Sequence, residues 1–340
     1  MKNFIFIMLL WSLSPFTGYS QNLVSRNKAG IQTVNGAVDP VNLQFCLTHE
    51  HLMSNFGKDP GEASYYNEKA LLSQVIPYLK KIKSLGVNSI FDCTTAYFGR
   101  RVDLLKIMAD STGLNIITNT GFYGAANDRY VPEFAYKATA EEIASKWIQE
   151  FKTGIDGTGI KPGFIKLAFD EGTPSKIDIK LFTAGILTHL KTGLSMAVHT
   201  GNNPEAINLQ LKLLKENGAD PSALILVHAQ QVVNMELLFR AASDGAWISL
   251  DGAKASNTKE YIDKLENFRT QKLLHKVLLS HDGDAYTMDG TMREFSAIME
   301  HLIPAMKSNG FTEMEIRELM VENPRKAFAF RFSSTTEIRK

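Results

Sequence analysis

Short apolar runs alternate with longer amphipathic stretches along most of this chain. The runs are rich in Ile, Val, Leu and Phe and are bounded by polar or turn-forming residues, which is typical of buried strands. Besides a strand that ends at His49, strands are expected at residues 88–93, 115–119, 163–167, 195–199, 224–228, 246–250 and 277–280. The amphipathic stretches predict helices at residues 66–84, 101–111, 140–153, 180–192, 204–216, 233–243, 259–275 and 291–308.

This alternation amounts to eight strand-then-helix units, which predicts an α/β fold with a parallel sheet covered by helices. Eight units without a long unrelated insertion favour a closed (β/α)8 TIM barrel, with an open doubly wound sheet as the alternative. No glycine-rich phosphate loop follows any of the runs, which removes the usual chemistry of the open sheet. A turn-forming Asn35 and Gly36 between short apolar segments predict a short N-terminal β-hairpin.

The first 20 residues have the layout of a secretory signal peptide. An early Lys2 precedes an apolar run at residues 4–13, and the small residues Gly18 and Ser20 have the spacing of a cleavage site. The run is shorter than the roughly 20 apolar residues of a transmembrane helix, although an uncleaved anchor is the alternative. We therefore expect a periplasmic or secreted protein, with one barrel domain at residues 21–340 and no membrane contact after cleavage.

The balance of charges and the two cysteines say more about the class of binding partner and the compartment than about the fold. The chain has 37 Lys and Arg against 36 Asp and Glu, so no broad positive field favours nucleic acid or an anionic membrane. A small molecule is the expected partner. Cys46 and Cys93 both lie in apolar strand-like segments, where core packing is the default and an oxidising compartment would also permit a disulfide.

Groups that bind metal ions recur where the apolar runs end. His49 and His51 are two residues apart at the end of a strand, so both imidazoles point to one side. Alone, such a pair is more often two surface or satisfied histidines. His199, His228 and Asp282 then follow three further runs, at the end of the strands where barrel enzymes carry their active sites. The repetition predicts a metal site in the barrel mouth.

Lys166 is a cation inside the apolar segment GFIKLAF, where burial without compensation costs several kcal/mol. An ion pair with Asp170 or Glu171 is one explanation. The other is that the neutral amine reacts with carbon dioxide to give a carbamate, whose two oxygens bridge two cations. The nearby histidine and carboxylate cluster favours the carbamate.

Several longer segments resemble the phosphotriesterase family of the amidohydrolase superfamily over nearly the whole mature length. They are VNGAVDPVNLQFCLTHEHL, FDCTTAYFGRRVDLLKIMADSTGLNIITNTGFY, GFIKLAF, AVHTG, LVHAQ, LSHDGD and ENPRKAF. The resemblance implies two divalent metal ions, with zinc as the default and manganese, cobalt or iron as alternatives. It assigns His49, His51 and Asp282 to the more buried ion, His199 and His228 to the more exposed ion, and carboxylated Lys166 to the bridge. It also implies a homodimer.

The resemblance further implies hydrolysis by a metal-bridging hydroxide, with Asp282 as the acceptor of its proton. Asp251 resembles a position that passes this proton outward, although a plain carboxylate on the barrel rim is the alternative. His281 is expected to be structural. Tyr123 stands where lactone-hydrolysing members carry a tyrosine, or it simply packs with its hydroxyl satisfied.

The substrate expected from these features is a lactone or carboxylic ester. Lys254 is only a loose substitute for the arginine that such lactonases carry after the aspartate, and the stretch GDAYTMDGT after Asp282 is short. Organophosphate triesters are the alternative substrates, and a non-catalytic metal-binding barrel is a second class of function. Phosphorylated lactones are not expected, because no cluster of Arg and Lys follows the strands; Arg100 and Arg101 begin a helix.

Overall fold

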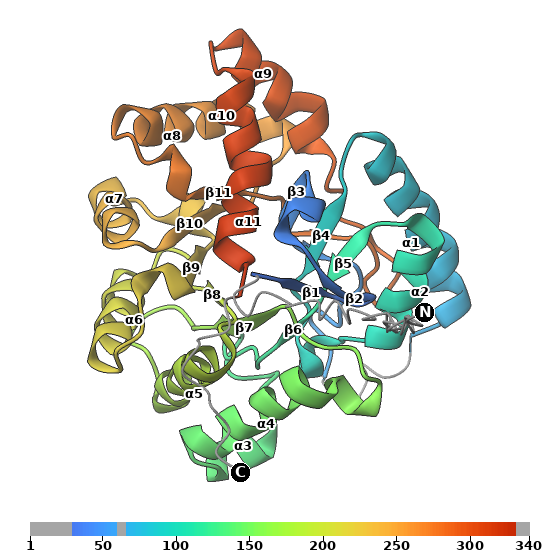
Figure 1. The fold of residues 1–340 in the computed structure, drawn as a ribbon, viewed down its shortest axis with the longest axis vertical. Helices are drawn as coiled ribbons and strands as arrows, with labels where there is room; N and C mark the ends of the chain where they lie inside the picture. Colours follow the sequence, from blue (N-terminus) through green and yellow to red (C-terminus); the bar gives the residue numbers. More distant parts are fainter. Residues whose placement is uncertain (1–28, 60–65, 331–340) are drawn as a thin grey trace, which may run out of the picture.

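The structure is a computed structural model that describes residues 29–59 and 66–330. The expected signal peptide, residues 1–20, lies outside the described residues. Strands occupy the centre and helices α1 to α9 surround them (Figure 1). No helix in the described ranges is long and apolar enough to cross a membrane.

The strands form the expected barrel, in which every neighbouring pair is parallel. The barrel strands are β3 (Cys46–His51), β4 (Ser89–Asp92), β5 (Asn115–Ile117), β6 (Asn119–Thr120), β7 (Phe164–Ala168), β8 (Met196–His199), β9 (Leu224–Val227), β10 (Trp247–Leu250), β11 (Val277–Leu279) and β12 (Gly283–Asp284). Two interruptions split the third strand into β5 and β6 and the eighth into β11 and β12. One sheet runs from β11 to β6 and the other from β12 to β5, so the two broken strands join the sheets into a closed ring.

The helices lie at or near the expected ranges, and further short helices form at residues 133–137, 313–317 and 323–328, where none was expected. They are α1 (Glu68–Ser84), α2 (Val102–Thr112), α3 (Glu133–Lys137), α4 (Ala140–Thr153), α5 (Lys176–Thr192), α6 (Pro204–Glu216), α7 (Met235–Asp244), α8 (Thr258–Thr270), α9 (Ile303–Ser308), α10 (Glu313–Arg317) and α11 (Asn323–Phe328). The apolar sides of α4 and α6 pack on the barrel, and Thr139 and Asn203 cap their N-termini.

Three expected helix boundaries are wrong. The helix expected from residue 180 begins at Lys176, and the helix expected to reach residue 275 ends at Thr270. A helix was expected from residue 291, but the backbone stays extended there and becomes helical at Ile298, in a π-helical turn that precedes α9. The reason is tertiary: Arg293 and Asp284 exchange backbone hydrogen bonds, and Phe295 is buried against Tyr78. The short segment after Asp282 is therefore a compact extended loop that folds back on the barrel.

An apolar cluster fills the barrel interior below the strand ends. It takes alternate residues from the strands, such as Phe91, Phe164 and Leu278, while their neighbours face the helices. Strands β1 (Ile31–Thr33) and β2 (Gly36–Val38) form the expected hairpin, and Ile31 joins this cluster from below. Cys46 is also in the cluster. Both Cys46 and Cys93 are buried and free, so the two do not form a disulfide.

Helix α11 closes the bottom of the barrel. Its Phe328 ring lies 4.1 Å from that of Phe91, measured between ring centroids. Asn323 fixes the start of the helix, because its buried amide donates 2.8 Å hydrogen bonds to the carbonyls of Leu274 and Val277. The segment before β11 and the helix that closes the barrel are thus joined through one side chain.

We expect Asn323→Ala to lower the free energy of unfolding by about 2–4 kcal/mol, because two buried carbonyls lose their donors and a cavity forms. Urea unfolding followed by circular dichroism measures the change. The control is Asn309→Ala, whose exposed amide donates to a single helical carbonyl. Equal effects of the two substitutions would contradict the assigned role of Asn323.

Candidate metal centre

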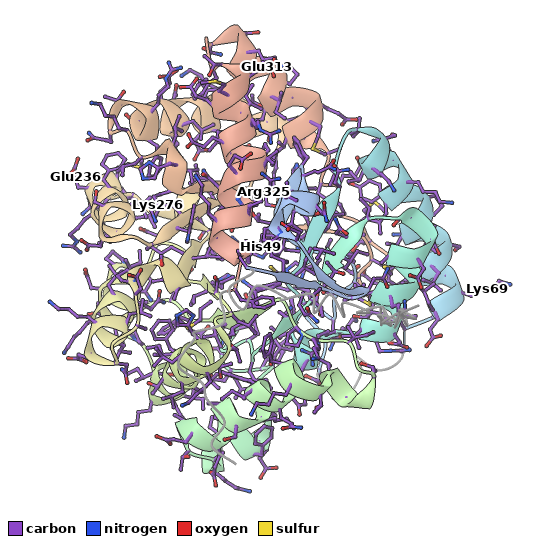
Figure 2. The ribbon with its side chains drawn as sticks, viewed as in Figure 1. His49, Lys69, Glu236, Lys276, Glu313 and Arg325 are labelled. Atoms are coloured by element: carbon purple, nitrogen blue, oxygen red, sulfur yellow. The ribbon has the colours of Figure 1, made fainter. Side chains whose placement is uncertain are left out.

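The barrel brings all the expected site residues to the carboxyl ends of its strands. His49 and His51 are in β3, Lys166 is in β7 and His199 ends β8. His228 directly follows β9, Asp251 follows β10, and Asp282 lies in the break between β11 and β12. His49 lies in the interior among the strands, whereas the labelled Lys69 and Glu236 project from the surface (Figure 2).

His49, His51 and Asp282 have the spacing of ligands to one ion. The Oδ1 atom of Asp282 lies 3.3 Å from Nε2 of His49 and 3.4 Å from Nε2 of His51. Two ligand atoms bound to one tetrahedral zinc ion at 2.0–2.1 Å are about 3.3 Å apart. The three side chains therefore present their ligand atoms to a common point, and the donor set suits zinc or a similar cation.

Asp251 holds two of the histidines by their other ring nitrogens. Its Oδ2 lies 2.9 Å from Nδ1 of His49, and its Oδ1 lies 2.7 Å from Nδ1 of His228. These are hydrogen-bond lengths, too short for an ion between the groups. A carboxylate only accepts, so each Nδ1 carries a proton, and in the neutral form of each ring the lone pair is on Nε2. His51 is held in the same way, because its Nδ1 lies 2.8 Å from the Thr94 hydroxyl, which itself donates to a carbonyl.

The alternative interpretation of Asp251, a plain carboxylate on the barrel rim, is wrong, because its side chain is fully buried. Burial by itself would raise the pKa of Asp251, but the paired His228 and His49 hold this pKa well below its usual value. Burial also lowers the pKa of His49 to about 4. At neutral pH the site therefore contains an ionised aspartate beside a neutral His49, which is the protonation state that a metal ligand requires.

His199 and Tyr123 form the other side of the site. The ring centroids of His199 and His228 are 4.4 Å apart, and the hydroxyl of Tyr123 lies 3.2 Å from Nδ1 of His199. Burial, followed by the neighbouring His228, holds the pKa of His199 well below its usual value. Burial likewise raises the pKa of Tyr123, so its hydroxyl keeps its proton at neutral pH.

Lys166 is fully buried, and its Nζ has no hydrogen-bond partner in the described part of the chain. The alternative explanation, an ion pair with Asp170 or Glu171, is wrong, because no described residue forms a salt bridge with Lys166. The carboxylate of Asp170 instead accepts from the backbone of Asn127. Leaving a buried ammonium unpaired would cost several kcal/mol. An orphaned amine among histidines and an aspartate fits carboxylation followed by metal binding, because the adduct is an anion that cations compensate.

Backbone strain is concentrated at two of these residues. His228 has φ 61° and Asp282 has φ 54°, both in the left-handed region that side chains with a Cβ rarely adopt. Each is held by a hydrogen bond from its own backbone N–H, to Asp251 for His228 and to the carbonyl of His49 for Asp282. Hydrogen bonds to other residues of the site therefore hold the left-handed backbone at both strand ends.

Glu50 is a functional residue that sequence reasoning missed. Its Oε1 accepts from Ser280 and from Nδ1 of His281, each at 2.7 Å, and its Oε2 accepts from the backbone of Gly283. The Nε2 of His281 accepts from the backbone of Ile298, so both ring nitrogens of His281 are used within the protein. The available signal was its place between His49 and His51, because a residue between two that face the site points to the opposite face.

Comparisons with known proteins match most of the chain. The phosphotriesterase family model matches residues 29–328. The chain is 27% identical over 311 residues to an aryldialkylphosphatase of Saccharolobus solfataricus, covering 86% of this chain and 97% of that protein. It is 26% identical over 347 residues to an N-acetyltaurine hydrolase of Xenopus tropicalis, covering 88% and 98%.

A solved structure shares the fold. It is a mutant of a PTE-like lactonase from Deinococcus radiodurans, which superposes with a TM-score of 0.81 at 24% identity and covers 88% of this chain and 99% of that one. The superposition supports the (β/α)8 assignment.

Asp251→Asn tests whether this aspartate orients the histidines. An amide keeps only one accepting oxygen, so one imidazole loses its fixed orientation, and we expect affinity for zinc to fall about 10- to 100-fold. Competition with a chromophoric chelator measures the affinity. Asp263→Asn, at an exposed carboxylate on α8, is the control and should bind zinc like the unmodified protein. Unchanged affinity in Asp251→Asn would rule out the orienting role.

Proposed function

Since this chain belongs to the phosphotriesterase family, a family of metal-dependent hydrolases, we propose that it holds two divalent metal ions and cleaves a lactone or another carboxylic ester. Zinc is the first candidate ion, with manganese, cobalt and iron as alternatives. The observation that carries the metal centre is the 3.3–3.4 Å spacing around Oδ1 of Asp282. The buried amine of Lys166, which has no hydrogen-bond partner among the described residues, supports a bridge between two ions.

In this proposal each site residue has one role. His49, His51 and Asp282 would hold one ion, His199 and His228 the other, and carboxylated Lys166 would contact both. The ions would lower the pKa of a water molecule and polarise the bond to be cleaved. Asp282 would accept the proton of the attacking water. Burial alone would raise its pKa, but the hydrogen bond to His51 and the neighbouring histidines hold this pKa below its usual value, so the carboxylate is ionised and has a lone pair available.

Asp251 would act as a positioning residue, because it holds the imidazoles of His49 and His228. Transfer of the proton from Asp282 to the outside through Asp251 stays a prediction. Tyr123 supports the ester and lactone preference. Its protonated hydroxyl lies beside His199, where it would donate to a substrate oxygen held at the second ion.

Two other substrate classes follow from the relatives. The Saccharolobus relative is called an aryldialkylphosphatase, and the Xenopus relative an N-acetyltaurine hydrolase. Phosphotriesters and N-acyl amides are therefore the alternatives, because one scaffold serves several reactions through changes in its loops. A non-catalytic metal-binding barrel is the alternative of a different class, and the complete set of ligand residues argues against it.

The test compares lactones, aryl esters, phosphotriesters and N-acyl amides as substrates of the mature protein, reconstituted with zinc, manganese or cobalt and with bicarbonate. We expect turnover of lactones or esters to dominate and Lys166→Ala to reduce it by at least about 10³-fold, because the bridge between the ions is lost. Metal content per chain, measured by mass spectrometry, should fall in the variant.

Dominant phosphotriester turnover would assign Tyr123 to packing and overturn the substrate preference. Full metal content and full activity in Lys166→Ala would overturn the bridge. Two bound ions without cleavage of any substrate would favour the non-catalytic alternative.

We also propose that the protein is exported and acts as a homodimer. Export is supported by the signal-like sequence of residues 1–20, and the homodimer by resemblance alone. Expression in a bacterial host, fractionation and N-terminal sequencing test export, and we expect a periplasmic or secreted product that begins at Gln21. A cytoplasmic product that keeps Met1 would contradict it.

A further inference from the structure

We propose that the cavity beside the metal centre binds an anionic group of the substrate through Lys254 and Arg293. This inference rests on the proposed function and names the substrate class: an ester, lactone or amide that carries a carboxylate, sulfonate or phosphate away from the bond to be cleaved. The cavity measures about 550 Å³, and its walls include His228, Asp251 and Asp282 as well as the two cations. A molecule in it would therefore reach the reacting centre.

The two cations come from different loops, each of which is held in place. Lys254 follows β10, and its backbone N–H donates to the Asn257 side chain at 2.8 Å. Arg293 belongs to the loop after β12, where its backbone N–H donates to the carbonyl of Asp284 at 2.8 Å. The sequence predicted no clustered Arg and Lys after the strands. That expectation is wrong at this site, because residues 39 positions apart line one cavity.

Within the described part of the protein, these two side chains have few acidic partners. Lys254 forms no salt bridge with any described residue, and the nearest acid to Arg293 is Asp282, at 3.7 Å. Asp282 is already shared between His49 and His51, so its charge is committed to the site. An incoming oxyanion would give both cations a partner.

The acidic residues of the cavity have partners other than Lys254, and the two aspartates among them are held by the histidines of the site. Glu260 and Glu294 also line it, but each faces a lysine outside the cavity wall: Lys264 lies 3.5 Å from Glu260, and Lys81 lies 4.0 Å from Glu294. Glu260 therefore has a cationic partner of its own, and Glu294 shares Lys81 with Glu300, which lies 3.6 Å from that lysine. Among the described residues that line the cavity, Lys254 and Arg293 are the cations.

The side of the site next to Tyr123 has the opposite character. The rings of Phe98 and Tyr123 stack with centroids 5.1 Å apart, and Phe98 also lies 5.4 Å from the ring of His51. Phe56 packs against Phe98 and is 62% exposed. An uncharged part of the substrate suits this aromatic wall, and the anionic part suits the wall with Lys254 and Arg293.

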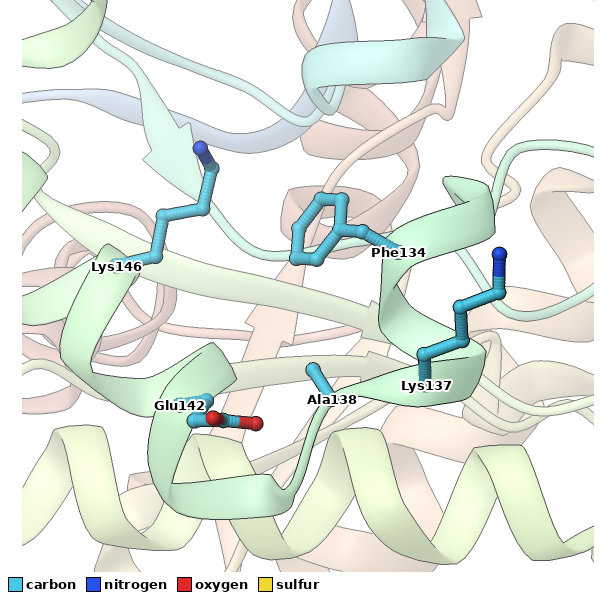
Figure 3. Close-up of a pocket in the computed structure, with 5 residues that line it drawn as sticks. All are labelled: Phe134, Lys137, Ala138, Glu142 and Lys146. Atoms are coloured by element: carbon cyan, nitrogen blue, oxygen red, sulfur yellow. The ribbon is translucent and has the colours of Figure 1, made fainter.

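A second pocket with lysines does not compete for this role. It lies between α3 and α4 and is lined by Phe134, Lys137, Ala138, Glu142 and Lys146 (Figure 3). It shares no residue with the metal centre. Its Lys137 is 2.6 Å from Glu133, and Lys146 lies over the ring of Phe134, so both cations already have partners within the protein.

The test is a matched series of esters that differ only in the terminal group: carboxylate, sulfonate, phosphate, neutral carboxamide or quaternary ammonium. With the metal-reconstituted protein at low salt, we expect kcat/KM for at least one anionic ester to exceed that of the carboxamide by about tenfold, the effect of a charge-assisted contact. Lys254→Gln and Arg293→Gln should each reduce this ratio toward one, and added salt should reduce it as well.

Lys259→Gln is the matched control, because this lysine is exposed on α8 and pairs with Asp263 away from the cavity; it should leave the ratio unchanged. A ratio of one in the unmodified protein, or a preference for the ammonium ester, would overturn the inference. So would Lys254→Gln and Arg293→Gln variants that reduce turnover of every ester equally, since the effect would then be on the metal centre.

Calorimetric binding of butanesulfonate to the metal-loaded protein separates this inference from the proposed function. Binding that weakens about tenfold in Lys254→Gln and not in Lys259→Gln would support the anion site even if no ester is cleaved. Absence of cleavage would overturn the proposed function alone. Butanesulfonate that fails to bind, or binds Lys254→Gln equally well, would overturn the anion site whatever the activity.

Discussion

The hydrogen bonds of the buried Asp251 carboxylate are the interactions on which the rest of the site depends. The carboxylate accepts from Nδ1 of His49 and from Nδ1 of His228, and so joins the first, sixth and seventh strands of the barrel through one side chain. A buried anion is stable only when its partners are in place. The same two contacts hold the Nδ1 side of each ring away from the candidate metal position. The contacts that stabilise the folded barrel therefore also orient the two histidines.

Glu50 has the corresponding role where the barrel closes. Its carboxylate receives hydrogen bonds from Ser280, His281 and Gly283, all from the broken eighth strand, and therefore ties that strand to the first. The break between β11 and β12 gives Asp282 its left-handed backbone and turns its side chain toward His49 and His51. The alternation in β3 thus divides its residues between two tasks: two histidines face the site while the glutamate between them closes the barrel.

The completed site is chemically asymmetric. Stacked aromatic rings at Phe98 and Tyr123 line one side, and a polar cavity with Lys254 and Arg293 opens on the other. Substrate selection in a barrel enzyme depends on such loop residues, whereas the strand ends carry the shared chemistry. This separation explains why relatives called by the names of different hydrolases align with this chain over most of its length at about one quarter identity.

The sequence by itself determined the barrel and the candidate ligands at its strand ends, because periodicity and the last residue of each strand are local properties of the chain. It also placed Lys166 in an apolar strand, and the structure confirms this, because every residue of β7 is buried. Only the tertiary structure decided the partners of these groups. Asp251 and His49 are 202 residues apart, and Glu50 and His281 are 231 apart, so no local pattern pairs them. The same holds for the start of the helical turn at Ile298 and for the meeting of Lys254 and Arg293, because closure of the barrel alone brings those loops together.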